Sequence, residues 1–276
     1  MSGAYIAATG VGKTYATRSG PLHAVADATF EADEGQFISL LGPSGCGKST
    51  LLMMLAGLEA PSTGALQLAG QRVAGARPDT GIIFQDATLL PWRSVLDNVM
   101  FPIEILKLPR EAHLERAHEL LARVGLTGFE EKRPHELSGG MRQRVAICRA
   151  LVHDPKVLLM DEPFSALDAI TRDQMNVVLS DMLERYRKTV IFVTHSIREA
   201  VYLSDRVLVM GGRPSSIILD LPVTFTRPRQ FAIEDTAEFG ALCRRLRETI
   251  EQAHGSTTSA SGALKTAHAR AGATHV

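Results

Sequence analysis

Residues 42–49 constrain this chain more than any other part of it. They read Gly-Pro-Ser-Gly-Cys-Gly-Lys-Ser and fill every fixed position of the phosphate-binding pattern G-x-x-x-x-G-K-[ST]. The apolar run of residues 37–41 before them predicts a buried strand, and residues 49–56 predict a helix that Gly57 ends. A strand, a glycine-rich loop and a helix in this order are the context in which the pattern binds nucleotide phosphates.

The residue types in this loop explain what it can bind. Glycines let the backbone close around an anion, and the N–H groups at the start of a helix point toward it. Lys48 is expected to reach the β- and γ-phosphates, and the Ser49 hydroxyl is expected to bind Mg²⁺. We therefore expect a nucleoside triphosphate with Mg²⁺. The predicted phosphate-binding residues are Gly42, Pro43, Ser44, Gly45, Cys46, Gly47, Lys48, Ser49 and Thr50.

The composition is typical of a soluble enzyme. Among 276 residues, Lys and Arg number 30 and Asp and Glu also number 30, so no bulk positive charge indicates nucleic-acid binding. We find no apolar run near the ~18 residues of a membrane span, and no apolar signal-peptide core. Cys46, Cys148 and Cys243 are too far apart to predict disulfides or a metal site, which fits a reducing cytoplasm. If the protein serves a membrane process, we expect it to act from the cytoplasmic face through a partner.

Strands alternate with helices along the chain, as a parallel α/β sheet requires. The predicted buried strands span residues 37–41, 157–160, 189–193 and 206–210. Gly42, Asp161 and His195 each follow one of these strands. Because ligands of open α/β sheets lie beyond the carboxyl ends of the strands, we expect these three residues to converge.

The pattern changes to helices between residues 86 and 155, where apolar residues recur at helical spacing. We therefore predict a nucleotide core made of residues 1–85 and 156–230, with a helical subdomain of residues 86–155 inserted in it. Residues 231–254 predict a C-terminal amphipathic helix. Residues 255–276 are nearly free of large apolar side chains and predict a disordered tail.

A second motif lies in the predicted helical subdomain, where residues 137–144 read Leu-Ser-Gly-Gly-Met-Arg-Gln-Arg. By itself it predicts a helix that Ser138 caps, with Gly139 and Gly140 leaving its first amides open to an anion. Between a phosphate loop and an apolar run that ends in Asp-Glu-Pro, it resembles the signature of the ATP-binding-cassette (ABC) ATPases. The resemblance covers about residues 5–230 and implies a RecA-like P-loop NTPase core with an inserted helical subdomain.

The resemblance also implies roles for single residues. Tyr15 matches the aromatic that stacks on adenine, although by itself it fits a core or surface aromatic. Gln85 matches a glutamine that contacts Mg²⁺ and water, and Asp161 matches the acidic residue that holds the metal. Glu162 matches the carboxylate that polarises the attacking water. His195 matches the switch histidine that contacts the γ-phosphate, although a lone histidine after a strand is more often structural.

The chain contains two helix starts suited to phosphate but one lysine-bearing loop. In the ABC ATPases a two-fold homodimer explains this, because the signature of one subunit closes on the ATP held by the other. The resemblance therefore implies that Ser138, Gly139, Gly140 and Gln143 act on the partner's ATP. Asp168 matches the loop that signals between the subunits. The implied catalytic residues are Glu162, His195, Gln85 and Lys48, with ATP and Mg²⁺.

Residues 85–99 are similar to the importer ATPases of the nitrate, sulfonate and taurine type, and the Leu-Pro-Trp segment carries most of this likeness. Importers of this type imply a multi-span permease and an extracytoplasmic substrate-binding protein, with the ATPase on the cytoplasmic face of the cell (inner) membrane. Trp92 lies where a cytoplasmic helix of the permease docks in the family. An alternative interpretation of Trp92 is a packed aromatic of the helical subdomain.

Other functions found in the same superfamily fit this sequence less well. A DNA-repair or chromosome ATPase needs a long coiled-coil insertion, and a translation factor usually needs a second phosphate loop; the sequence has neither. A cassette that drives export or membrane-lipid handling remains an alternative, which the Leu-Pro-Trp segment disfavours. The transported solute does not follow from the sequence.

Overall fold

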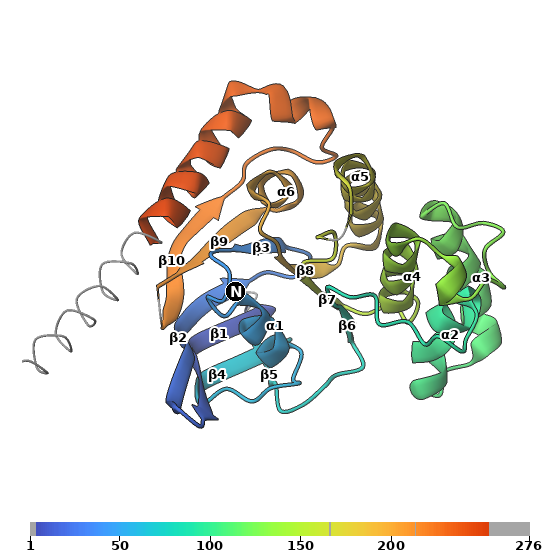
Figure 1. Ribbon diagram of the computed structural model, residues 1–276, viewed down its shortest axis with the longest axis horizontal. Helices are drawn as coiled ribbons and strands as arrows, with labels where there is room; N and C mark the ends of the chain where they lie inside the picture. Colours follow the sequence, from blue (N-terminus) through green and yellow to red (C-terminus); the bar gives the residue numbers. More distant parts are fainter. Residues whose placement is uncertain (1–3, 166, 213, 254–276) are drawn as a thin grey trace, which may run out of the picture.

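One mixed sheet of ten strands runs through the computed structural model, which describes residues 4–165, 167–212 and 214–253 (Figure 1). Its strands follow the order β5-β4-β1-β2-β10-β9-β3-β8-β7-β6. They are β1 (Ile6–Thr17), β2 (Gly20–Ala32), β3 (Phe37–Leu41), β4 (Thr63–Leu68), β5 (Gln71–Arg72), β6 (Thr80–Ile83), β7 (Val157–Asp161), β8 (Thr189–Val193), β9 (Arg206–Gly211) and β10 (Ser215–Pro222). The predicted tail of residues 255–276 lies outside the described residues.

The strands β9, β3, β8, β7 and β6 form the parallel part of the sheet. The strands predicted at residues 37–41 and 189–193 are confirmed at the same residues as β3 and β8. All five residues of β3, β7 and β8 are buried, because helices or other strands cover both faces. This double burial explains why each reads as an unbroken apolar run in the sequence.

The other part of the sheet is mostly antiparallel, apart from a short parallel pairing of β10 with β2, and was not predicted. β1 pairs with β2 and with β4, and β10 pairs antiparallel with β9. The ladder of β1 and β2 shifts register at several places, for example between Ala8 and Val11. Such bulges interrupt the alternation of apolar and polar residues on which strand prediction depends.

Two apolar clusters lie on the two faces of the parallel strands. Side chains of a strand alternate between faces, so Ile38 and Leu40 of β3 join one cluster and Phe37 and Leu41 join the other. The first cluster also contains Leu51 and other residues of α1, together with residues of β1, β2 and β4. α1 is therefore enclosed between the antiparallel and parallel parts of the sheet, which fixes the loop that precedes it.

The helices are α1 (Lys48–Leu55), α2 (Val95–Ile105), α3 (Arg110–Arg123), α4 (Gly139–Leu151), α5 (Ala169–Tyr186) and α6 (Ile197–Leu203), with short 3-10 turns η1 (Pro134–Glu136) and η2 (Phe231–Asp235). A last helix spans residues 237–253, where an amphipathic helix was predicted. Its Phe239 and Leu246 are buried against the second cluster. In Figure 1 this helix crosses the side of the molecule where α6 lies.

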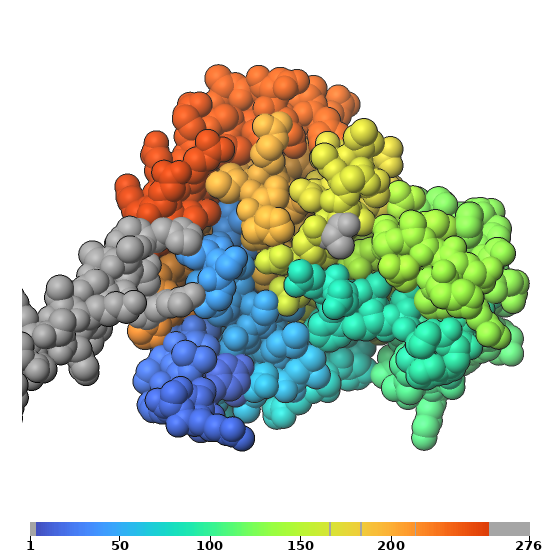
Figure 2. Space-filling view, in the orientation of Figure 1, coloured from blue at the N-terminus to red at the C-terminus, as the bar shows by residue number. Residues whose placement is uncertain are grey.

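The helices α2, α3 and α4 lie between β6 and β7 in the chain, within the stretch predicted to be a helical subdomain. We call α2, α3, η1 and α4 the helical lobe. In Figures 1 and 2 it stands beside the sheet as a separate bulge, drawn in green. Ser94 and Ser138 cap α2 and α4 by accepting hydrogen bonds from Asp97 N (3.1 Å) and Met141 N (3.2 Å). Gly125, at φ 73°, follows the end of α3.

Candidate nucleotide site

The loop between β3 and α1 has the backbone geometry that a phosphate cradle needs. Gly42 and Gly47 have φ angles of 152° and 92°, in the region that favours glycine. A Cβ on Gly42 would lie 2.3 Å from Met210 O, and one on Gly47 would lie 2.7 Å from Ala24 O. Both positions therefore exclude a side chain, and the loop can pack tightly against β9 and β2.

Lys48 holds the loop closed. The lysine is buried, and its Nζ donates to Gly42 O and Pro43 O, each at 2.9 Å. Ser44 and Gly45 at the tip of the loop are exposed. The ammonium group is therefore fixed directly beneath the tip, where it can neutralise phosphate oxygens. Cys46 is buried in the same loop.

Ser49 and Asp161 form an oxygen-rich pair next to the lysine. The Ser49 hydroxyl donates to Asp161 Oδ1 at 3.0 Å, bringing the start of α1 to the end of β7. Burial raises the pKa of the Asp161 carboxyl, and the charge of Glu162 adds to that rise, whereas Ser49 and Lys48 oppose it. A cation would relieve this buried charge.

Hydroxyl and carboxylate oxygens are the ligands that Mg²⁺ prefers, and it commonly takes one or two from protein and the rest from phosphates and water. Within the described ranges, no group of three His, Cys, Asp or Glu residues could hold a metal by itself. Ser49 and Asp161 therefore fit Mg²⁺ brought in with a nucleotide. Such an ion would supply charge neutralisation at the phosphates.

Glu162 and His195 meet at the carboxyl ends of neighbouring parallel strands. Glu162 follows β7, and its N–H donates to Val193 O of β8 at 2.9 Å. The carboxylate Oε2 lies 3.1 Å from His195 Nδ1. The structure thus places Gly42, Asp161 and His195 at one edge of the sheet, where the sequence predicted that they converge.

Glu162 has a left-handed backbone, with φ 45°, although it is not glycine. Such residues are uncommon and cluster at functional sites. The conformation turns the carboxylate out of the strand direction while the N–H stays bonded to β8. A histidine nitrogen beside a carboxylate, both open to solvent in part, can orient a water molecule for attack on a phosphate.

α4 connects the helical lobe to the segment that contains Gln85. Gln143 Nε2 donates to Phe84 O at 3.1 Å, and the Arg149 guanidinium donates to Ala87 O at 2.8 Å and Thr88 O at 2.9 Å. Gln85 itself is exposed. Arg149 was missed by sequence reasoning because a lone arginine in a helix carries no local signal of a contact 61 residues away.

The prediction that Gln143 acts on the partner's ATP needs correction. Its side chain is buried, at 5% exposure, and faces the core through its bond to Phe84. Ser138 and Gly139, by contrast, are exposed at the start of α4. The signature motif runs through several turns of one helix, so its residues point in different directions. Gln143 belongs to the connection between lobe and core.

The start of α4 lies next to the loop that contains Asp168. A Cβ on Gly140 would lie 3.3 Å from Leu167 Cδ2 and 3.5 Å from Thr171 Cγ2. Asp168 is exposed, and its two carboxylate oxygens accept from Thr171 N (3.0 Å) and Thr171 Oγ1 (2.8 Å). Asp168 therefore has a structural role in this subunit, because it caps the first turn of α5.

Tyr15 and Trp92 lie on the surface in different places. Tyr15 is half-buried near the end of β1, with Lys13 Nζ 4.9 Å from the centre of its ring. Trp92 is 69% exposed in the loop before α2, so it is not a packed residue of the lobe within this chain. Its neighbour Arg93 is paired with Glu104 of α2, which fixes the loop against the lobe.

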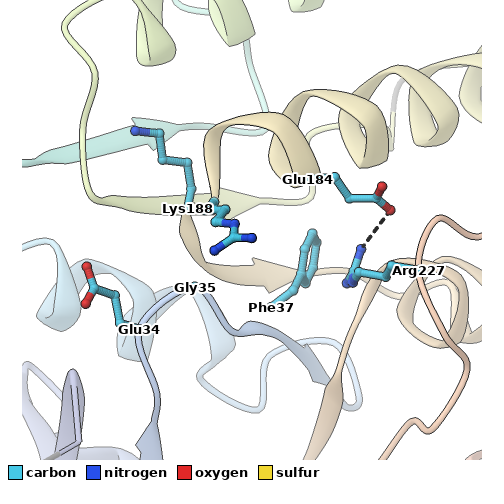
Figure 3. A pocket seen from close by; sticks show the side chains of 7 residues that line it. Glu34, Gly35, Phe37, Glu184, Lys188 and Arg227 are labelled. Atoms are coloured by element: carbon cyan, nitrogen blue, oxygen red, sulfur yellow. Dashed lines mark ion pairs between the residues drawn. The ribbon is translucent and has the colours of Figure 1, made fainter. Parts of the chain in front are cut away.

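Hollows in the described part of the chain lie away from the loop of residues 42–49. A groove of about 390 Å³ separates β6 from α2 and is lined by Phe84, Phe101, Ile105 and Arg149 among others. The second hollow, of about 290 Å³, lies at the amino end of β3 beside Phe37 (Figure 3). In it Arg227 pairs with Glu184 at 3.9 Å and with Asp205 at 3.0 Å. The five residues of β3 separate this second hollow from Gly42, so it is not part of the nucleotide site.

Comparison with known proteins agrees with this geometry. Residues 25–165 match the family described as ABC transporter. The chain belongs to the ABC transporter family. An uncharacterized ABC transporter ATP-binding protein of Methanocaldococcus jannaschii is 48% identical over 75% of this chain and 77% of its own length. The taurine import ATP-binding protein of Burkholderia pseudomallei is 43% identical (81% of this chain, 86% of the relative), and the nitrate import ATP-binding protein of Synechococcus elongatus is 42% identical (82% and 84%).

Solved structures support the same conclusion. A dimeric bacterial ABC transporter cassette has a TM-score of 0.72 and 31% identity, covering 80% of this chain and 100% of that one. The same identity and coverage, with a TM-score of 0.71, hold for a dimeric post-hydrolysis state of an ATP-binding cassette bound to ADP and phosphate. The chain is an ABC ATPase with the P-loop NTPase fold. No helix in the described part of this ABC family member is long and apolar enough to cross a membrane.

Proposed function

We propose that this chain is the ATP-hydrolysing subunit of an importer that carries a small anion or an organic sulfur or nitrogen solute. The observation that supports this most is the likeness to taurine and nitrate import ATP-binding proteins, at 43% and 42% identity over more than four fifths of the chain. Growth of a deletion strain tests it. Loss of growth on taurine, another sulfonate or nitrate as the only sulfur or nitrogen source is expected, and normal growth on all of them contradicts the importer.

In this proposal the active form is a two-fold homodimer with two composite sites. The loop of residues 42–50 holds ATP, Ser49 and Asp161 hold Mg²⁺, and the other subunit closes the site with Ser138 and Gly139, which are exposed, and Gly140, which is half-buried. Tyr15 stacks on the adenine, and Glu162, His195 and Gln85 orient the attacking water. Asp168 lies beside the start of α4, where the second subunit would arrive.

The proposed partners are a multi-span permease and, through it, an extracytoplasmic substrate-binding protein, with this chain on the cytoplasmic face of the cell membrane. The groove between β6 and α2 fits a short permease helix, because Phe101 and Ile105 offer apolar surface beside the Arg149 guanidinium. Trp92 stands exposed on the lobe, as an interface anchor does before its partner binds.

We expect Trp92→Ala to weaken assembly with the permease and abolish uptake. Truncation of an aromatic anchor typically costs ~2 kcal/mol or more of binding, over tenfold in affinity. Because Trp92 is exposed, the free subunit should keep its stability and its ATPase rate. The measurements are thermal unfolding and ATPase rate of the free subunit, then co-purification with the permease encoded nearest its gene.

Leu22→Ala is a matched control, because Leu22 is also an exposed large apolar side chain, at 57%, but lies on β2. It should leave assembly unchanged. A drop in the unfolding temperature of Trp92→Ala, or unchanged recovery of the complex, overturns the docking role.

A further inference from the structure

The exposed side chain of His195 contacts the Glu162 carboxylate at 3.1 Å, and the backbone turn that carries it sets where the imidazole begins. The imidazole is 56% exposed. The two residues that flank it, Thr194 and Ser196, are joined across it, because Ser196 N donates to Thr194 Oγ1 at 3.0 Å. Thr194 is buried, and its own N–H donates to Leu40 O of β3 at 3.3 Å. The hydroxyl of Thr194 therefore fixes the turn on which His195 stands.

That hydroxyl is held in turn by Glu199, a buried carboxylate of α6 that no sequence motif marks. Thr194 Oγ1 donates to Glu199 Oε2 at 2.5 Å, which uses the one proton of the hydroxyl. The Ser196 N–H then occupies an acceptor position of the same oxygen. The order of donors and acceptors is thus fixed, and it depends on Glu199 being an acceptor.

Glu199 has a counter-charge from a different part of the site. Its other oxygen, Oε1, lies 3.5 Å from Arg172 Nε, and Arg172 Nη2 donates to Leu167 O at 2.9 Å. Arg172 is in the first turn of α5, shortly after Asp168. The pair therefore connects the His195 turn to the loop beside the start of α4.

We infer that Glu199 is a positioning residue for His195 in ATP hydrolysis, acting through the Thr194 hydroxyl and held by Arg172. The structural alternative is that Glu199 only stabilises α6, to which it belongs. The two alternatives differ in one respect. A positioning role requires the hydroxyl of Thr194, whereas a stabilising role requires only that the space be filled. The inference depends on the proposed role of His195 in the reaction.

The test compares steady-state ATP hydrolysis of single variants and one double variant of the full chain. Thr194→Val keeps the shape and removes the hydroxyl, and Thr194→Ser keeps the hydroxyl. Glu199→Gln keeps the shape and removes the charge. His195→Ala is the reference for loss of the histidine. Thr189→Val is the matched control, because Thr189 is a buried threonine at the other end of β8 whose Oγ1 accepts from Gly35 N at 2.9 Å.

We expect Thr194→Val and Glu199→Gln to lower kcat by ~10–100-fold, the scale of a misplaced catalytic group. The KM for ATP should stay within about twofold, because Lys48 and the phosphate loop are untouched. Thr194→Ser should recover most of the rate, and Thr189→Val should keep it. The double variant Thr194→Val/Glu199→Gln should be no slower than the slower single variant, because both lesions break one chain of contacts.

Each other outcome decides against the inference. An unchanged kcat in a folded Thr194→Val or Glu199→Gln variant contradicts it, and so does an equal loss in Thr189→Val. Thermal unfolding identifies the folded variants. If Thr194→Val does not fold, the kcat of Glu199→Gln compared with that of Thr194→Ser still decides, because the inference requires a loss in the first and a nearly normal rate in the second. Multiplying losses in the double variant also contradict it. If His195→Ala keeps the wild-type kcat, the proposed role of His195 fails instead, whatever the other variants do.

Discussion

Replacement of Glu162 by glutamine is expected to lower the rate of ATP hydrolysis by ~10²–10⁴-fold, the usual loss for a positioned general base. Glutamine keeps the shape of the side chain beside His195 Nδ1 but removes the charge that orients water. Lys48, Ser49 and Asp161 are unchanged, so ATP should still bind, and the proposed dimer should persist with ATP trapped in it. The measurements are kcat, ATP affinity and the oligomeric state with ATP present.

Glu119→Gln provides the matched control for this variant. Glu119 is on α3, where it pairs with Arg123 at 2.9 Å, away from the nucleotide site. Removing its charge should leave hydrolysis and binding as they are. A rate near that of the unaltered protein in Glu162→Gln removes Glu162 from the reaction, and a loss of ATP binding instead assigns it to the binding of the nucleotide.

Mixing two inactive variants is expected to restore activity. Lys48→Ala removes the ammonium group beneath the phosphate loop of its own subunit, and Ser138→Arg obstructs the site on the partner's loop. Each homodimer then has two damaged sites and should be inactive. In a mixed dimer both lesions fall on one composite site and the other is intact. About half of randomly paired dimers are mixed, so roughly a quarter of the full rate is expected if one site turns over alone.

Three controls make this result interpretable. Ser138 also caps α4, and losing a cap costs about 0.5–2 kcal/mol of stability, so thermal unfolding of Ser138→Arg is measured first. Mixing a variant with itself must give no recovery. The same mixture is then made with Glu162→Gln in both subunits, and trapped ATP is counted. If the first mixture recovers no hydrolysis but the Glu162→Gln mixture traps one ATP per mixed dimer, the composite site forms and the two sites are coupled in turnover. If the Glu162→Gln mixture traps no ATP, the composite site is contradicted.

Local patterns in the sequence were enough to predict the centre of this site. The loop of residues 42–49 carries its own geometry in its glycines, and β3, β7 and β8 are recognisable because both of their faces are buried. The side chains that follow those strands must meet, because parallel strands end at one edge. For this reason the order of strands and motifs along the chain predicts that Gly42, Asp161 and His195 lie together.

Contacts between distant parts of the chain could not be predicted in the same way. The antiparallel strands β1 and β2 contain register shifts that disturb alternation, so they left no clear pattern. Arg149 and Glu199 act through single hydrogen bonds to segments whose position depends on the whole fold. The prediction for Gln143 followed from its membership of the signature motif. Its position on the helix, however, turns its side chain toward Phe84 and the core.

The hydrogen bonds from α4 to residues 84–88 couple the position of this segment to the position of the helix. Gln143 and Arg149 hold the carbonyl groups of Phe84, Ala87 and Thr88 from the same helix whose first turn is open to a second subunit. Each such bond contributes about 0.5–1.5 kcal/mol, so a tilt of α4 is easier if this segment travels with it than if the bonds break. A displacement of the first turn of α4 should therefore also displace the stretch of backbone that leads to Trp92.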